Sequence, residues 1–304
     1  HRRINFIDGI RGNIEHGIAV AITPDRQQRE EALKEIEENE RVVSGKTFLA
    51  RSTASGGIEI IEPYEQRNAW KHISNSPRGK NLVWEFHCED ESTFVGKFDP
   101  TKPESHAFKQ HAGAEVVQFE RQLDFAHEFG YSGIMVVKHV SNPETIRIGK
   151  DFQRRVKTHF RILYETTWHH MFLNIEEDYP IHGNLVKMNP PLRTKKMQEE
   201  LLEHVLRGDT HLIGTDHAPH PYEQKVGEPY KSGISAIAFY PKGIGILRIL
   251  GMREPEIKRV TVDTGNMVYF NGRLKPKCVG GVDYDPELWN KYGMNVWSRI
   301  DGTK

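Results

Sequence analysis

Short apolar runs that end in a polar or ionisable residue recur along the chain. They are residues 42–45 before Lys46, 82–86 before His87, 134–137 before Lys138 and His139, and 211–213 before the turn that holds Asp216. Continuous apolar runs of this length are typical of strands buried on both faces, as in a parallel sheet covered by helices. The pattern therefore predicts parallel strands that each bring a reactive side chain to their carboxyl end.

Helical periodicity fills the stretches between these runs. Apolar residues recur every three or four positions in residues 27–39, 112–130 and 195–208. Gly130 and Gly208 lie where a helix is expected to end. Because strand and helix alternate, the sequence predicts an α/β fold with a mainly parallel sheet.

The length of 304 residues falls in the range of one barrel domain. We expect a TIM-like (β/α)8 barrel over residues 1–270. After Phe270 the rhythm is replaced by Gly, Pro, Lys, Asp and Trp. Residues 271–304 are therefore predicted to form a tail that packs on the barrel or on a partner subunit.

Composition narrows the choice of partner. Forty-two basic and 42 acidic residues give no net charge, which argues against nucleic acid or an acidic membrane surface and favours a small molecule. No apolar run approaches the roughly 20 residues that span a bilayer. Cys88 and Cys278 show no paired spacing, which predicts a cytoplasmic protein without a Cys-based zinc site.

The residue types at the strand ends suit a divalent metal. Imidazole nitrogens and carboxylate oxygens, as in His87, His139 and Asp216, are common ligands of zinc-type ions. A parallel barrel presents such ligands and proton-transfer groups at the carboxyl ends of its strands. The sequence therefore predicts a metal-dependent hydrolase.

Two late motifs make a family resemblance specific. Lys-Met-Asn-Pro-Pro-Leu-Arg at 187–193, followed by Gly-Thr-Asp-His-Ala-Pro-His at 214–220, resembles the paired signature of the dihydroorotases of the amidohydrolase superfamily. Further matching segments lie at 42–48, 87–90, 139–141 and 165–170, the last with Trp168 in place of the usual proline. The resemblance covers roughly residues 20–270.

The resemblance implies reversible hydrolysis of dihydroorotate to N-carbamoyl-L-aspartate, in de novo pyrimidine synthesis. It implies one or two divalent metal ions, with zinc the first choice. Lys46, once carboxylated, would bridge the ions, and His87 and His139 would bind the second one. Asp216 would bind the first ion and act as the general base. A plain ion pair for Lys46 and a helix N-cap for Asp216 are the simpler alternatives.

The same resemblance implies three substrate contacts. His220 and Arg11 would hold the substrate carboxylate, and Asn189 would orient the ring. His169 and His170 are interpreted as structural partners of the site. Surface or capping roles are predicted for His1, His16, His72, His106, His111, His127, His182 and His204.

One part of the chain departs from the family pattern. The first strand of the family ends in Asp-x-His-x-His-x-Arg, whereas residues 8–12 read Asp-Gly-Ile-Arg-Gly. Part of the first βα units is therefore absent from the sequence. Either the sequence omits segments, or the protein is a degenerate relative with a broken metal site. The intact later motifs favour omission, because a barrel that lacks a whole unit should not close.

Two other functions stay open. The first is another cyclic amidase, such as a hydantoinase or allantoinase. The second is a non-catalytic scaffold for a partner such as aspartate transcarbamoylase, with a homo-oligomer as a further arrangement. A His-x-His in the coding sequence around residues 9–12 would argue against the scaffold.

Overall fold

The computed structural model describes residues 16–52, 56–275 and 295–302. In this part of the chain one sheet holds six strands in sequence order, and every neighbouring pair is parallel. The strands are β1 (Ile18–Ala21), β2 (Val42–Phe48), β3 (Val83–His87), β4 (Ile134–Val137), β5 (Arg161–Thr167) and β6 (Leu212–Gly214). The predicted α/β architecture is confirmed, as a curled part of a barrel whose edges are β1 and β6.

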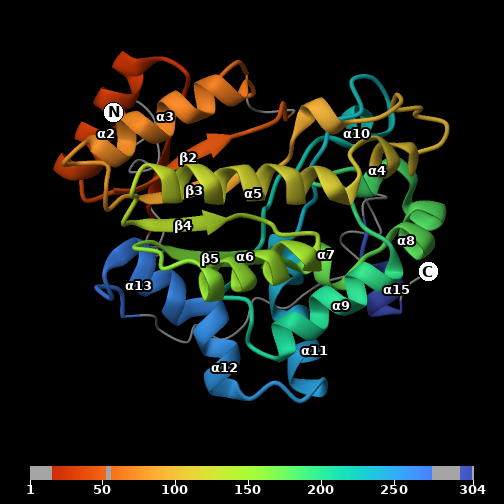
Figure 1. Ribbon diagram of the computed structural model, residues 1–304. Coiled ribbons are helices and arrows are strands. Elements are labelled where there is room, and N and C mark those ends of the chain that lie inside the picture. The colour runs from red at the N-terminus through yellow and green to blue at the C-terminus, as the bar shows by residue number, and fades with distance from the viewer. Residues whose placement is uncertain (1–15, 53–55, 276–294, 303–304) are drawn as a thin grey trace.

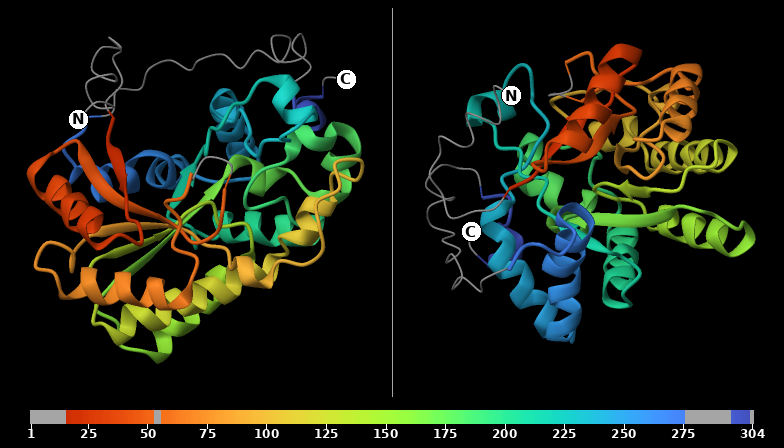
Figure 2. Two further views of the ribbon diagram at one scale, coloured as in Figure 1. Left: turned by 90° about the horizontal axis from the view of Figure 1, so that it is seen from above. Right: turned by 90° about the vertical axis from the view of Figure 1, so that its left-hand side faces the viewer.

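Helices connect the strands as predicted. Those after β1 to β4 are α2 (Arg26–Glu38), α3 (Pro63–Asn75), α5 (Ala112–Glu128) and α6 (Pro143–Arg155), with η1 (Glu91–Thr93) and α4 (Ser105–Lys109) before α5. Side chains of Asp25 and Asn142 cap α2 and α6 by accepting a hydrogen bond from a backbone N–H of the first turn. Helices α2, α3, α5 and α6 lie along one side of the sheet (Figure 1, Figure 2).

The later connections are longer. Between β5 and β6 lie α7 (Trp168–Phe172), α8 (Ile175–His182), η2 (Gly183–Val186) and α9 (Lys195–Leu206). After β6 come α10 (Tyr222–Val226), η3 (Ile237–Phe239), α11 (Tyr240–Ile249), α12 (Glu254–Lys258), η4 (Arg259–Asp263), α13 (Thr264–Phe270) and α15 (Ser298–Asp301). No helix in the described residues is long and apolar enough to cross a membrane.

The outer face of the sheet carries the larger core. Trp84 and Phe86 of β3 point to this face and pack on Trp70 of α3, with ring centroids 4.3 and 5.5 Å apart. All three rings are about 1% exposed. Aromatic side chains of this size contribute much of the burial that holds the helices on the sheet.

The inner face is apolar at one end and polar at the other. Val136, Leu163 and Leu212, from three neighbouring strands, pack against Val268 of α13. Since side chains alternate between faces along a strand, the next inward positions belong to Lys138 and its neighbours. Helix α13 thus covers the amino ends of the strands and leaves the carboxyl ends for chemistry.

Residues 295–302 of the predicted tail pack on a second hydrophobic core, which includes Phe239 and Trp168. Trp297 stacks on Phe239 with ring centroids 3.8 Å apart, and Arg299 pairs with the buried Asp178 at 2.9 Å. The division into a barrel at 1–270 and a tail at 271–304 stays a prediction.

Candidate functional site

Two predicted metal ligands face each other at the carboxyl ends of β3 and β4. The Nδ1 atom of His87 lies 3.0 Å from Nε2 of His139, and the ring planes are 72° apart. Both rings are almost fully buried, at 2% and 4% exposure. Burial lowers the pKa of His139 well below its ordinary value, and the neighbouring His87 and Lys46 lower it further. A neutral imidazole with a free lone pair is the form that binds a metal.

Lys46 lies in the same neighbourhood. It pairs in register with Glu85 of β3, two residues before His87. Burial, assisted by the charge of Lys138, lowers the pKa of Lys46 to about 8, although Glu85 and Asp216 oppose this effect. A neutral amine is the form that reacts with carbon dioxide, so the environment of Lys46 suits carboxylation. Asp216, the fourth predicted ligand, lies close enough for its charge to raise the pKa of Lys46.

The donor set fits a zinc-type ion only if Lys46 contributes an oxygen. Across residues 16–52, 56–275 and 295–302, no three His, Cys, Asp or Glu side chains are grouped closely enough to hold an ion by themselves. However, Nδ1 of His87 and Nε2 of His139 face each other at 3.0 Å, close enough to share one ion. Two imidazole nitrogens and a carboxylated lysine are ligands that zinc accepts.

Two predicted site residues have an unusual backbone conformation. His139 has φ 39° and Asp216 has φ 43°, both in the left-handed region. Non-glycine residues are uncommon there, although Asp and His tolerate the region better than most. Such conformations often occur at active sites. Here they occur two residues after the ends of β4 and β6.

An ion network that sequence reasoning missed lies next to these ligands. The Nζ atom of Lys138 is 2.5 Å from Glu165 Oε2 and 3.2 Å from Glu85 Oε2, and the Ser44 hydroxyl donates to Glu85. The inward period-two positions of β3, β4 and β5 could have revealed the network. Glu85, however, lies inside the run at residues 82–86, whose other four residues are apolar.

Asn189 is held by a histidine that sequence analysis placed at the surface. His106 Nε2 lies 2.9 Å from Asn189 Oδ1 and 3.0 Å from the Met188 carbonyl oxygen. The prediction of a surface or capping role for His106 is wrong, because the ring is 3% exposed. Burial lowers its pKa to about 3, so the ring is neutral. His106 carries no motif, so its sequence gave no signal.

His220 is tied to the backbone. Its Nε2 donates to the Ser232 carbonyl oxygen at 2.9 Å, and burial lowers its pKa. A neutral imidazole has one N–H, so Nδ1 can then only accept a hydrogen bond. Contact with a substrate carboxylate therefore requires either the imidazolium or release of Ser232.

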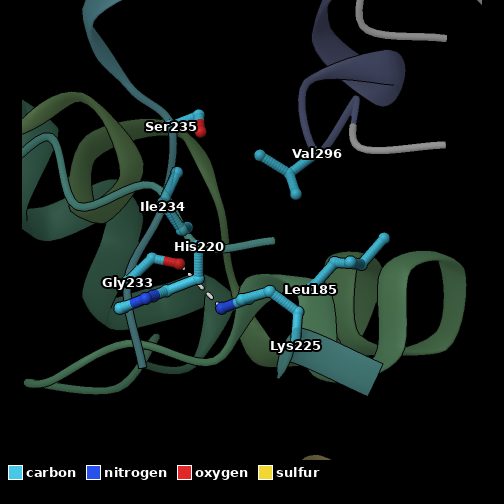
Figure 3. Close-up of a pocket in the computed structure, with 7 residues that line it drawn as sticks. All are labelled: Leu185, His220, Lys225, Gly233, Ile234, Ser235 and Val296. Carbon is cyan, nitrogen blue, oxygen red and sulfur yellow. Dashed lines mark hydrogen bonds between the residues drawn. The ribbon is translucent and has the colours of Figure 1, made fainter. Parts of the chain in front are cut away.

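A buried lysine joins the segments that carry the two predicted substrate contacts. Lys225 Nζ donates to the carbonyl oxygens of Lys187 and Gly233 at 2.7 Å each, and the Gly233 N–H donates to Lys187 at 2.9 Å. Figure 3 shows Lys225 and His220 beside Gly233 in a small pocket. The Asn189 segment is thus fixed next to the loop that bears His220.

The remaining predicted residues are Arg11, His169 and His170. Arg11 and the interrupted motif at residues 8–12 lie outside the described residues. His169 and His170 are buried at 1% and 3% exposure, and His170 Nε2 donates to the Pro190 carbonyl oxygen at 3.0 Å.

Comparisons with known proteins support the resemblance. No family model matches the chain. A dihydroorotase of Listeria innocua serovar 6a is 38% identical over 142 residues, which are 46% of this chain and 32% of the relative. A dihydroorotase of Staphylococcus epidermidis is 40% identical over 112 residues, 37% of this chain and 25% of the relative. The matched stretch spans about a third of the length of the curated relatives.

Solved structures share the fold. L-hydantoinase from Arthrobacter aurescens has a TM-score of 0.69 at 20% identity and covers 88% of this chain and 60% of its own. Dihydroorotase from Saccharomyces cerevisiae, in complex with 5-fluoroorotic acid, has a TM-score of 0.65 at 17% identity and covers 88% and 71%. The fold is that of these cyclic amidohydrolases, and the similarity in sequence is to dihydroorotases.

Proposed function

We propose that this chain carries active-site residues of a dihydroorotase, an enzyme that hydrolyses the cyclic amide of dihydroorotate to N-carbamoyl-L-aspartate in pyrimidine synthesis. The observation that carries the proposal is the 3.0 Å approach of His87 Nδ1 to His139 Nε2, beside the buried amine of Lys46. The sequence similarity to dihydroorotases supports this substrate over that of the hydantoinases, whose likeness extends to the fold alone.

In this proposal His87, His139 and carboxylated Lys46 hold a divalent ion, with zinc as the first candidate, and Asp216 faces the same space. When bound there, such an ion would supply a positive charge that polarises the amide carbonyl and lowers the pKa of the attacking water to about 7. The Asp216 carboxylate accepts the proton of the water and delivers it to the departing ring nitrogen. Its exposed position at the mouth of the site allows it to reach both atoms.

Substrate recognition falls to residues on the two joined segments. His220 would donate to the exocyclic carboxylate, in exchange for its bond to Ser232. Asn189, whose carbonyl oxygen already meets His106, would orient the ring with its remaining amide donors. Arg11 would add a second cation. A homo-oligomer, or a complex with aspartate transcarbamoylase, belongs to the same proposal.

The test joins zinc analysis to a dihydroorotate assay on the purified chain and on Asp216→Asn. The amide of Asn cannot accept the proton of water, so turnover should be abolished while the circular dichroism spectrum is retained. Asp263→Asn is the matched control, because Asp263 pairs with Lys258 on the surface. Near-normal turnover in Asp216→Asn would contradict the assignment.

The same assay separates the alternatives. Faster hydrolysis of hydantoin or allantoin than of dihydroorotate would identify another cyclic amidase. A folded chain that binds aspartate transcarbamoylase and turns over none of these substrates would favour the scaffold.

A further inference from the structure

Arg193, the last residue of the Asn-Pro-Pro-Leu-Arg segment, connects three of the motifs. It is 4% exposed. Its Nε donates to Ser141 Oγ at 2.9 Å, and its Nη1 donates to the Gln110 carbonyl oxygen at 2.6 Å. Its Nη2 lies 3.7 Å from Glu89 Oε1, which is within ion-pair range. The guanidinium thus lies between the segments that carry His87 and His139.

Glu89 connects Arg193 to His87. The carboxylate is 1% exposed, and its Oε2 lies 3.2 Å from His87 Nε2, the ring nitrogen that faces away from His139. The contact does not meet hydrogen-bond geometry, and His87 Nε2 has no other partner among the described residues.

Ser141 completes the link on the other side. It lies two residues after His139, and both its N–H and its hydroxyl donate to the buried Glu115, the N–H at 3.0 Å. Because Ser141 is held by Glu115 and also accepts from Arg193, the backbone that follows β4 is fixed relative to Glu89. The two histidines therefore share one buried support.

We propose that Glu89 and Arg193 are positioning residues that fix the tautomer and orientation of His87. Of the two neutral tautomers, a carboxylate beside Nε2 favours the one whose proton is on Nε2, which leaves the Nδ1 lone pair facing His139. Arg193 holds the carboxylate in place through its charge and its two other hydrogen bonds. The part that concerns metal binding rests on the proposed function, whereas the tautomer of His87 does not.

The experiment compares the full chain with Glu89→Gln. Nitrogen-15 NMR of histidine-labelled protein, with His87→Gln used to assign its signals, reports which ring nitrogen carries the proton. We expect the proton on Nε2 in the wild type. In Glu89→Gln the amide can donate to Nε2, so the Nδ1–H form should become substantially populated. Zinc affinity, measured by competition with a chelator, should fall by about tenfold to a hundredfold.

Asp178→Asn is the matched control. Asp178 is also a buried carboxylate paired with an arginine, Arg299, but its described contacts include no histidine. This variant should leave the His87 tautomer and the zinc affinity unchanged. If Glu89→Gln does not fold, Glu89→Asp keeps the charge but withdraws it by one methylene, and should cause the same changes to a smaller degree.

The outcomes separate the two proposals. An Nδ1–H tautomer of His87 in the wild type, or a tautomer that neither Glu89 variant alters, overturns the positioning role. A wild-type chain that binds no zinc overturns the proposed metal site, and the tautomer then still decides the role of Glu89.

Discussion

Replacement of Lys138 by Met should strongly destabilise the protein. Lys138 is the ammonium between Glu85 and Glu165 on the inner face of the sheet, and its side chain is 21% exposed. Met has a similar length and packs well, so the main change is electrostatic. The substitution leaves two carboxylates, at 7% and 8% exposure, without the cation that both contact.

The magnitude follows from the distances. At 2.5 and 3.2 Å, and with an effective dielectric constant of about 20, each pair contributes about 5 to 7 kcal/mol of attraction. Desolvation of the ammonium and its repulsion of Lys46 offset much of this. Loss of one partner from such a buried group typically costs about 3–5 kcal/mol, which is the expected fall in the free energy of unfolding.

Urea denaturation at pH 5 and pH 8 is the assay. Without Lys138 the pKa of the remaining carboxylates should rise, and a raised folded-state pKa stabilises the fold at low pH and loses that effect as pH rises. The deficit of Lys138→Met should therefore be larger at pH 8 than at pH 5. Glu165→Gln in the same chain should recover part of it, because one uncompensated charge is removed.

Lys150→Met provides the control. Lys150 pairs with Asp209 but is 50% exposed, so its loss should cost at most about 1 kcal/mol. A deficit of this small size for Lys138→Met, equal at both pH values, would refute the reasoning.

Two further predictions concern histidines. His220→Ala should leave the zinc content unchanged and lower kcat/KM for dihydroorotate about tenfold to a hundredfold, since a charge-assisted hydrogen bond contributes about 1.5 to 3 kcal/mol. An equal loss with an uncharged dihydropyrimidine would argue against recognition of the carboxylate by His220. The pKa of His106 is about 3 in the fold against an ordinary 6.5, so its stabilising contribution is complete above pH 6.5 and is lost as pH falls toward 3. His106→Gln should flatten that slope in urea titrations, and an unchanged slope would show that other groups cause it.

Four of the six described strands, together with helices α2, α5 and α9, could be predicted because each is encoded locally. The run at residues 134–137 coincides with β4, and the helical pattern at 195–208 contains α9. The approach of His87 to His139 could be predicted for the same reason, since the carboxyl ends of parallel strands meet at one edge of the sheet. Local patterns thus indicate both the architecture and which strand-end side chains lie together.

The supporting groups could not be predicted, because their partners are distant in sequence. His106 on the short helix α4 meets Asn189, and Glu89 after β3 meets Arg193 before α9. A lone buried histidine or arginine has no local signature, and only the folded chain brings its partner within reach. The Lys138 network is an intermediate case, visible from strand alternation once the inner face is known.

The backbone at His139 and Asp216 links the fold to the proposed chemistry. Both residues lie two positions after the end of a strand, and both adopt a positive φ that glycine would adopt without strain. Folding alone would therefore favour glycine at each position. A side chain that costs conformational energy is best explained by what it does, and at both positions it is a group to which the proposed function gives metal binding or proton transfer. The positive φ values thus occur at residues that the sequence motifs assign to the predicted site. The backbone conformation and the motifs are independent observations.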